Sequence, residues 1–140
     1  MASDTGKTYS EDSVKKALAA IKFDAAGLVP AIAQQHDSGE VLMMAWMNAE
    51  AVSETLRTGQ VCYYSRSREK LWRKGESSGQ VQSLVNFRID CDGDTLLLHV
   101  VQKGVACHTG RRNCFFNELS EDGINIIADV EIDPKDLYGE

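Results

Sequence analysis

The stretch "VQSLVNFRIDCDGDTLLLHVVQK", residues 81–103, decides the fold. Apolar and polar residues alternate over 81–90, which is the period of a strand with one buried face. The mostly apolar run over 95–103 predicts a second strand directly after it. The residues expected on the buried face of the first strand are Val81, Val85, Phe87 and Ile89.

Two short helices are predicted before this stretch. Apolar residues recur at helical spacing from Ser13 to Ile21. Asn48 has the properties of an N-terminal cap, and Gly59 can end the helix that follows it. The N-terminal half therefore supplies helices that can cover a sheet.

The other segments are strand-rich. Residues 28–47 read as two strands joined by a hairpin at 37–39, 61–65 has strand composition, and 124–140 offers one more strand and a frayed end. Residues 66–80 contain five cations, two glycines and no apolar period, which predicts a long basic loop. Long loops inside compact domains usually carry function.

Length and composition define the class of protein. A chain of 140 residues that is 43% hydrophobic and 26% charged suits a globular protein. We expect residues 1–12 to form a flexible N-terminal tail and 13–140 to form one domain. The net charge of −6 argues against a nucleic-acid binder, and no apolar run approaches the roughly 20 residues of a membrane span.

The expected location is the cytoplasm, because the polar N-terminus has no apolar signal-peptide region. The chain has four cysteines. Cysteines in a reducing compartment favour metal-binding or catalytic roles over disulfides.

Three carboxylates lie on alternate residues between the two strands: Asp90, Asp92 and Asp94. In an extended segment they would share one side, with Cys91 on the opposite side. Three close carboxylates repel one another unless water or a cation screens them, and oxygen ligands suit Mg²⁺ or Ca²⁺. The alternatives are a solvated acidic turn, which Gly93 permits, and the nucleophile of an aspartate-dependent phosphatase.

The loop after the second strand, "GVACHTGRRNC", predicts a zinc site. Two thiols, Cys107 and Cys114, lie in it with His108, and zinc takes sulfur and nitrogen ligands. Cys91 is a candidate third ligand, which would leave one tetrahedral position open, as in catalytic zinc sites. The alternatives are small buried hydrophobic cysteines or a zinc-stabilised interaction module without catalytic activity. Cys62, within a strand, favours the buried role.

Four segments together resemble one family: "LVPAIAQ…GEVLMMAWMN", "YYSRSREKLWRKGESSG", "DCDGDTLLL" and "GVACHTGRRNCF". They are similar to phosphoribosyl-AMP cyclohydrolases, and the similarity runs from about Leu28 to Phe116. The resemblance implies a hydrolase that opens the purine ring of N1-(5-phosphoribosyl)-AMP between N1 and C6, the third step of histidine biosynthesis. It implies an α+β, predominantly antiparallel, barrel-like fold with two short helices, in an intertwined homodimer.

The same resemblance assigns roles to residues. One Zn²⁺ per subunit would be held by Cys107, Cys114 and Cys91, with Cys91 coming from the partner subunit, and His108 would be the catalytic residue. The Mg²⁺ ligands would be Asp90, Asp92 and Asp94. The residue pattern agrees with a shared site: if Cys91 points away from the aspartates, it cannot easily reach the other thiols of its own chain.

The basic loop supplies candidate contacts for a nucleotide that carries two phosphates. Trp72 could stack on the base, although core packing is the alternative for this residue. For each cation the alternative is ordinary surface charge. The candidate phosphate ligands are Arg66, Arg68, Arg73 and Lys74. The expected partners are this small-molecule substrate and a second subunit, with no nucleic acid and no membrane.

Overall fold

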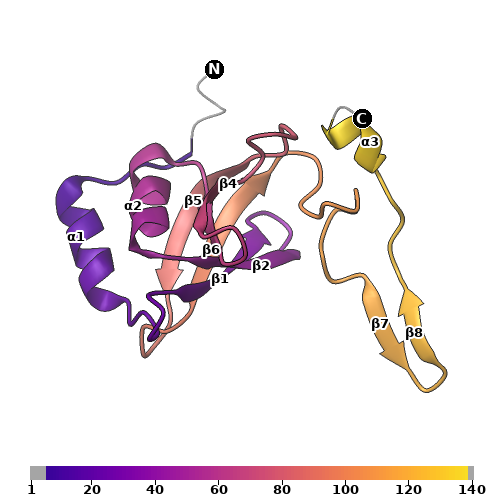
Figure 1. Cartoon of the computed structure of the whole chain (residues 1–140), viewed down its shortest axis with the longest axis horizontal. Helices are drawn as coiled ribbons and strands as arrows, with labels where there is room; N and C mark the ends of the chain where they lie inside the picture. The colour runs from indigo at the N-terminus through magenta and orange to yellow at the C-terminus, as the bar shows by residue number, and fades with distance from the viewer. Residues whose placement is uncertain (1–5, 139–140) are drawn as a thin grey trace.

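The computed structural model describes residues 6–138 and is centred on a four-stranded sheet (Figure 1). Its strand order is β2-β1-β6-β5. The outer pairs are antiparallel and the central pair β1·β6 is parallel, so two hairpins lie side by side. The four strands are β1 (Val29–Gln35), β2 (Val41–Met47), β5 (Gln82–Ile89) and β6 (Leu96–Gln102).

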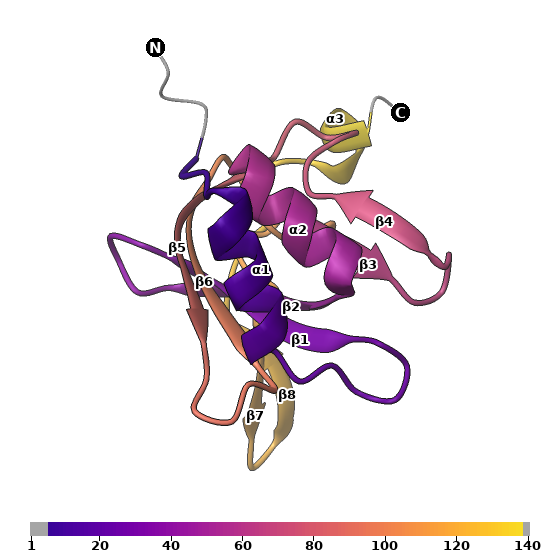
Figure 2. The same ribbon diagram turned by 90° about the vertical axis from the view of Figure 1, so that its left-hand side faces the viewer.

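Two helices, α1 (Glu11–Ala20) and α2 (Ala49–Thr58), cover one face of this sheet (Figure 2). Each begins where a side chain accepts a backbone N–H: Ser10 accepts from Ser13, and Asn48 accepts from Ala51. The end of α2 at Gly59 has a φ of 77°, which glycine adopts without strain.

The core lies between these helices and the sheet. Every second residue of β1 and β6 is buried there, which matches the alternation expected of strands with one buried face. Its largest fully buried side chains include Tyr63, Leu42, Met47, Leu56, Leu84, Leu96 and Leu98.

The prediction of a barrel-like sheet is wrong. The remaining strands are four residues long and pair in separate hairpins, so within residues 6–138 the sheet stays open at β2 and β5. Closure into a barrel with a filled interior takes about eight strands of matched length. The short strands are β3 (Cys62–Ser65), β4 (Lys70–Arg73), β7 (Asn117–Ser120) and β8 (Gly123–Ile126).

Three further predictions are corrected. The described residues contain three helices rather than two, because α3 (Pro134–Tyr138) forms in the segment expected to fray. The predicted loop at 66–80 contains β4, which pairs with β3. The single strand expected in 124–140 is instead the second strand of the hairpin β7–β8, which projects from the body in Figure 1.

The predicted strand over 81–90 is confirmed, but a bulge changes which residues face the core. The register runs from Leu84 opposite Val100 to Asn86 opposite His99, so Val85 has no cross-strand partner. One extra residue reverses the alternation. Leu84 is therefore buried in the first half of the strand, and Phe87 packs against the core in the second half.

The tail predicted at residues 1–12 lies partly outside the described residues, which begin at Gly6. The described part is bonded to the body: Lys7 N–H donates to the Leu84 carbonyl at 2.7 Å, and Tyr9 N–H donates to that of Leu56 at 2.8 Å. Within residues 6–138, no helix is long and apolar enough to span a bilayer.

Candidate functional site

The loop that follows β6 brings Cys107 and Cys114 together. Backbone bonds across the loop join Ala106 N–H to the Arg112 carbonyl at 2.9 Å and Cys107 N–H to that of Arg111 at 3.2 Å. Burial, and then the neighbouring Cys107 thiol, raise the pKa of Cys114 to about 12. The two sulfurs therefore form a close pair, with Cys107 buried and Cys114 partly buried.

The hydroxyl of Thr109 completes the surroundings of this thiol pair. It donates a hydrogen bond to the Cys107 sulfur at 3.1 Å. This bond orients the Cys107 sulfur within the pair. The donor set therefore suits a soft cation such as Zn²⁺.

Arg112 fixes this loop to the sheet. Its guanidinium donates to the Gly104 carbonyl at 2.6 Å, to the Gln102 carbonyl at 3.2 Å and to the side-chain oxygen of Gln35 at 2.9 Å. It also pairs with Glu40 at 3.4 Å. The guanidinium of Arg112 thus joins the end of β1, the end of β6 and the cysteine loop.

Replacing Arg112 with alanine is expected to lower the free energy of unfolding by about 2–3 kcal/mol, because several buried acceptors lose a charged donor. Urea denaturation of the metal-free protein measures this loss. Lys103→Ala, which removes an exposed cation of the same loop region, is the matched control and should change the stability little. Equal stabilities of the two variants would contradict the anchoring role of Arg112.

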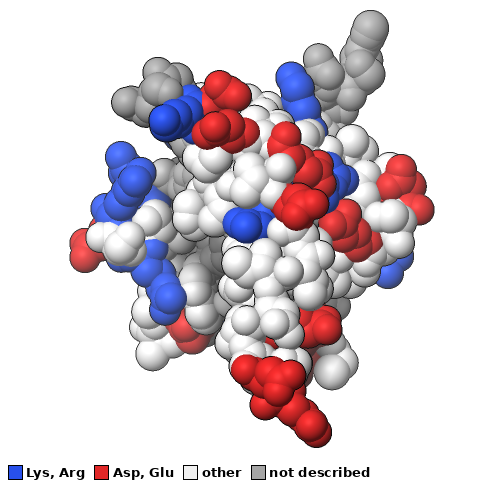
Figure 3. Space-filling view, turned by 90° about the vertical axis from the view of Figure 1, so that its right-hand side faces the viewer, with Lys and Arg blue, Asp and Glu red and all other residues white. Residues whose placement is uncertain are grey.

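The exposed side chain of His108 lines a cavity of about 910 Å³. Its other walls come from the β3–β4 hairpin and the residues that follow it, and they include Arg68, Trp72, Arg73 and Lys74. Four of the five predicted substrate contacts therefore line the same cavity as the predicted catalytic histidine. In Figure 3 the cations gather on the edge formed by this hairpin, away from the acidic tip of β7–β8.

The predicted substrate contacts differ in how they are held. Arg66 lies outside the lining of the cavity, and its guanidinium stacks on Trp46 at 4.8 Å. Arg73 forms a two-bond ion pair with Glu54 of α2. Trp72 is 39% exposed and packs against Tyr63, with ring centroids 5.4 Å apart.

Lys74 is half-buried and differs from the other cations of the cavity. Its ammonium donates to the Ala106 carbonyl at 2.8 Å. Burial lowers the pKa of Lys74, and the nearby thiols of Cys114 and Cys107 oppose this effect. Its charge therefore acts directly on the thiol pair.

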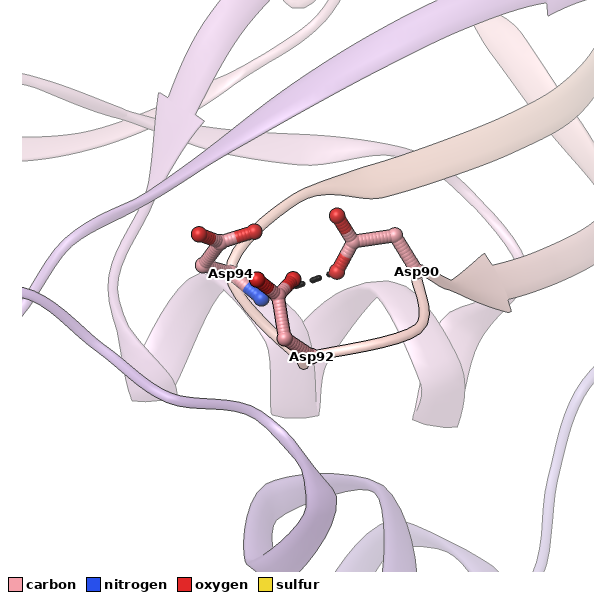
Figure 4. A group of neighbouring side chains, drawn as sticks. All are labelled: Asp90, Asp92 and Asp94. Carbon is pink, nitrogen blue, oxygen red and sulfur yellow. Dashed lines mark hydrogen bonds between the residues drawn. The ribbon is translucent and has the colours of Figure 1, made fainter.

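The three aspartates meet in the turn between β5 and β6, where their carboxylate oxygens lie within 4.8 Å of one another (Figure 4). The extended segment assumed from the sequence is wrong. Asp90 accepts the Asp94 N–H at 2.9 Å and the Thr95 N–H at 3.3 Å, and Gly93 has a φ of 80°. The turn, rather than strand alternation, gathers the carboxylates.

Hydrogen bonds among its residues shift the pKa values of two aspartates of this turn in opposite directions. Partial desolvation acts to raise the pKa of Asp90, but hydrogen bonds with Asp94 and Thr95 outweigh it and leave that pKa below its usual value. Hydrogen bonding with Asp92, and then with Asp90, raises the pKa of Asp94. The close oxygen atoms are of the kind that a hard cation such as Mg²⁺ prefers.

Cys91 lies exposed in the same turn, at the opposite end of β6 from the cysteine loop. The seven residues of this strand span about 23 Å at roughly 3.3 Å each. In residues 6–138, the aspartates form the one group of three potential metal ligands this close together. Within one chain, Cys91 therefore lies far from Cys107 and Cys114.

Sequence reasoning missed the anchors of the site, namely Arg112, Gln35 and Gln102. Gln102 is buried, and its side-chain amide donates to the carbonyl of Val105 at 3.2 Å in the cysteine loop. The available signal was a glutamine at a buried position at the end of each central strand, where burial requires polar partners.

Comparison with known proteins gives one consistent result. The sequence model of the family described as phosphoribosyl-AMP cyclohydrolase matches residues 43–116. Proteins of that name are 74% identical in Alkalilimnicola ehrlichii (86% of this chain, 85% of the relative) and 68% identical in Paramagnetospirillum magneticum (86% and 92%). A third, in Chromohalobacter salexigens, is 59% identical over 98% of this chain and 94% of its own length. The chain therefore belongs to the phosphoribosyl-AMP cyclohydrolase family of enzymes.

Proposed function

We propose that the protein hydrolyses the N1–C6 bond of N1-(5-phosphoribosyl)-AMP, which opens the purine ring and gives the formimino aminoimidazole carboxamide nucleotide of histidine biosynthesis. The observation that carries the proposal is the cavity of about 910 Å³ that joins His108 to the basic residues of the β3–β4 hairpin. Its cations suit a substrate with two phosphates, and His108 lies next to the thiol pair through Cys107.

The chain's own residues would act as binding groups and as a proton carrier. Arg68 would contact phosphate oxygens, and the partly exposed ring of Trp72 would stack on the base. His108 would take a proton from the attacking water and return it to N1 as the ring opens. His108 is exposed on the cavity wall, where a bound nucleotide would be accessible to it.

The thiol pair fits zinc, so we propose that Cys107 and Cys114 hold one Zn²⁺ per subunit. A zinc ion there would supply Lewis acidity, which lowers the pKa of a water molecule from 15.7 to about 7. Thr109, the hydrogen-bond donor to Cys107, would keep that sulfur oriented. This proposal requires reduced thiols, as in the cytoplasm.

The third sulfur, Cys91, would come from a second subunit. This assignment also explains why Cys91 lies between aspartates. A turn that delivers Cys91 to the thiol pair of the partner also delivers Asp90, Asp92 and Asp94 to the same cavity. There these carboxylates would hold Mg²⁺, whose chemistry is to bind phosphate oxygens.

Two exposed apolar surfaces support a homodimer. On the sheet face away from α1 and α2, Ile32 lies beside Met44 on one side and Leu97 on the other. On the projecting hairpin, Leu119 is 78% exposed and Ile124 is 63% exposed. Exposed apolar surface often marks an interaction site, so a second copy that covers both surfaces is consistent with an intertwined dimer.

Removal of zinc is expected to abolish ring opening, with a loss of more than about 100-fold, because the water loses its acidity. The assay follows the absorbance of the nucleotide, with metal content measured on the same samples. Zn²⁺ added back should restore turnover, whereas Mg²⁺ alone should not.

Normal ring opening by zinc-free protein would overturn the proposed role of zinc, and absence of ring opening by the zinc-loaded protein would overturn the proposed reaction. Release of phosphate from simple esters by zinc-free protein would instead support an aspartate-dependent phosphatase. Tight zinc binding without turnover would support an interaction module.

A further inference from the structure

Lys74 is held by the cysteine loop and not by an acidic side chain. It directly follows β4, and its ammonium donates to the carbonyl of Ala106 at 2.8 Å. Ala106 is buried and precedes Cys107. Among the described residues no carboxylate lies within ion-pair distance of Lys74, whereas Arg73 is paired with Glu54 and Arg112 with Glu40.

A half-buried ammonium without a carboxylate requires other partners, and besides the Ala106 carbonyl it has the Trp72 ring, whose centroid is 5.8 Å away. The two sulfurs are the groups whose charges act on Lys74, Cys114 most strongly and then Cys107. The neighbouring cation Arg111 is held elsewhere, by the Ala128 carbonyl and the Phe116 ring.

We propose that Lys74 is a positioning residue for the metal centre: its ammonium fixes the Ala106–Cys107 backbone and so holds the Cys107 sulfur in place beside Cys114. This inference rests on the proposed zinc site. Lys74 thereby differs from the phosphate contact that the sequence suggests.

The two roles of Lys74 predict different measurements. A phosphate contact would raise the KM for the nucleotide and leave the affinity for metal unchanged. A positioning residue for the thiol pair lowers the affinity for metal in the absence of any nucleotide. Metal binding without substrate therefore separates the two.

The experiment is a competition between the full-length, metal-free protein and a coloured chelator for Zn²⁺, repeated with Co²⁺ to record the thiolate-to-cobalt absorption. Lys74→Met, which keeps the length of the side chain and removes its charge, is expected to bind Zn²⁺ about ten-fold more weakly. Lys74→Arg should recover most of that loss. Lys103→Met, an exposed cation of the same loop region, should bind as the wild type does.

Circular dichroism and thermal melting of the metal-free variants show whether Lys74→Met is folded. If it is not folded, the comparison of Lys74→Arg with the wild type tests the role of Lys74, because the inference requires that Lys74→Arg bind Zn²⁺ with nearly wild-type affinity. Equal affinity of Lys74→Met and wild type, or equal losses in the Met and Arg variants, would overturn the role of Lys74. Absence of zinc binding by the wild type would instead overturn the zinc site itself, and this inference with it.

Discussion

Mixing the inactive variants Cys91→Ala and Cys107→Ala is expected to restore about a quarter of wild-type activity. Random exchange places about half of the subunits in heterodimers, and each heterodimer has one intact site out of two. In that site, the Cys91→Ala subunit supplies the pair Cys107 and Cys114, and the other subunit supplies Cys91. The physical reason is the length of β6, which separates Cys91 from its own chain's thiol pair.

A matched control distinguishes complementation from nonspecific recovery. A mixture of Cys107→Ala and Cys114→Ala should stay inactive. Each site takes both of these cysteines from the same chain, so every site in the mixture contains one of the two substitutions. Subunit exchange is verified with two differently tagged variants. Inactivity of the first mixture after verified exchange would show that the sites are not shared.

The strands on either side of residues 90–94 could be predicted, but which of their residues face the core could not. Alternation predicted β5 and the apolar run predicted β6. The bulge at Val85 left no local signal, because it depends on where β6 pairs with β5. β4 was missed for a related reason: its residues Lys70–Arg73 carry no apolar alternation, and pairing with β3 stabilises it.

The open sheet could not be predicted from the elements alone. The resemblance suggested a barrel, and the pattern of strands did not exclude one. Which strands become edges depends on contacts between residues far apart in the chain, such as the parallel pairing of Ala31 with Leu96.

The candidate metal-binding and catalytic residues, such as Cys107 and His108, stand out in the sequence by residue type, but the residues that support them do not. Arg112 looks like an exposed loop residue in "CHTGRRNC". Its partner Gln35 is 77 residues away in sequence, and the pattern of a single segment cannot report such a contact.

His108→Ala is expected to lower kcat by about 100- to 10,000-fold, the usual contribution of a positioned proton carrier. The side chain is exposed on the cavity wall, so its removal should leave the fold and the zinc content unchanged. Steady-state kinetics and a metal count on the same preparation check both expectations. His36→Ala, which removes another exposed histidine outside the cavity lining, is the matched control and should retain wild-type turnover.

The metal count decides between the two roles open to His108. A proton carrier can be lost without loss of zinc, because the sulfurs supply the affinity. A histidine that fills the fourth zinc position cannot be lost in this way, since a tetrahedral site that loses one protein ligand binds its metal more weakly. Reduced turnover with full zinc content would therefore assign His108 to proton transfer. Reduced turnover together with zinc loss, reversed by excess zinc, would make it a ligand and require another base in the cavity.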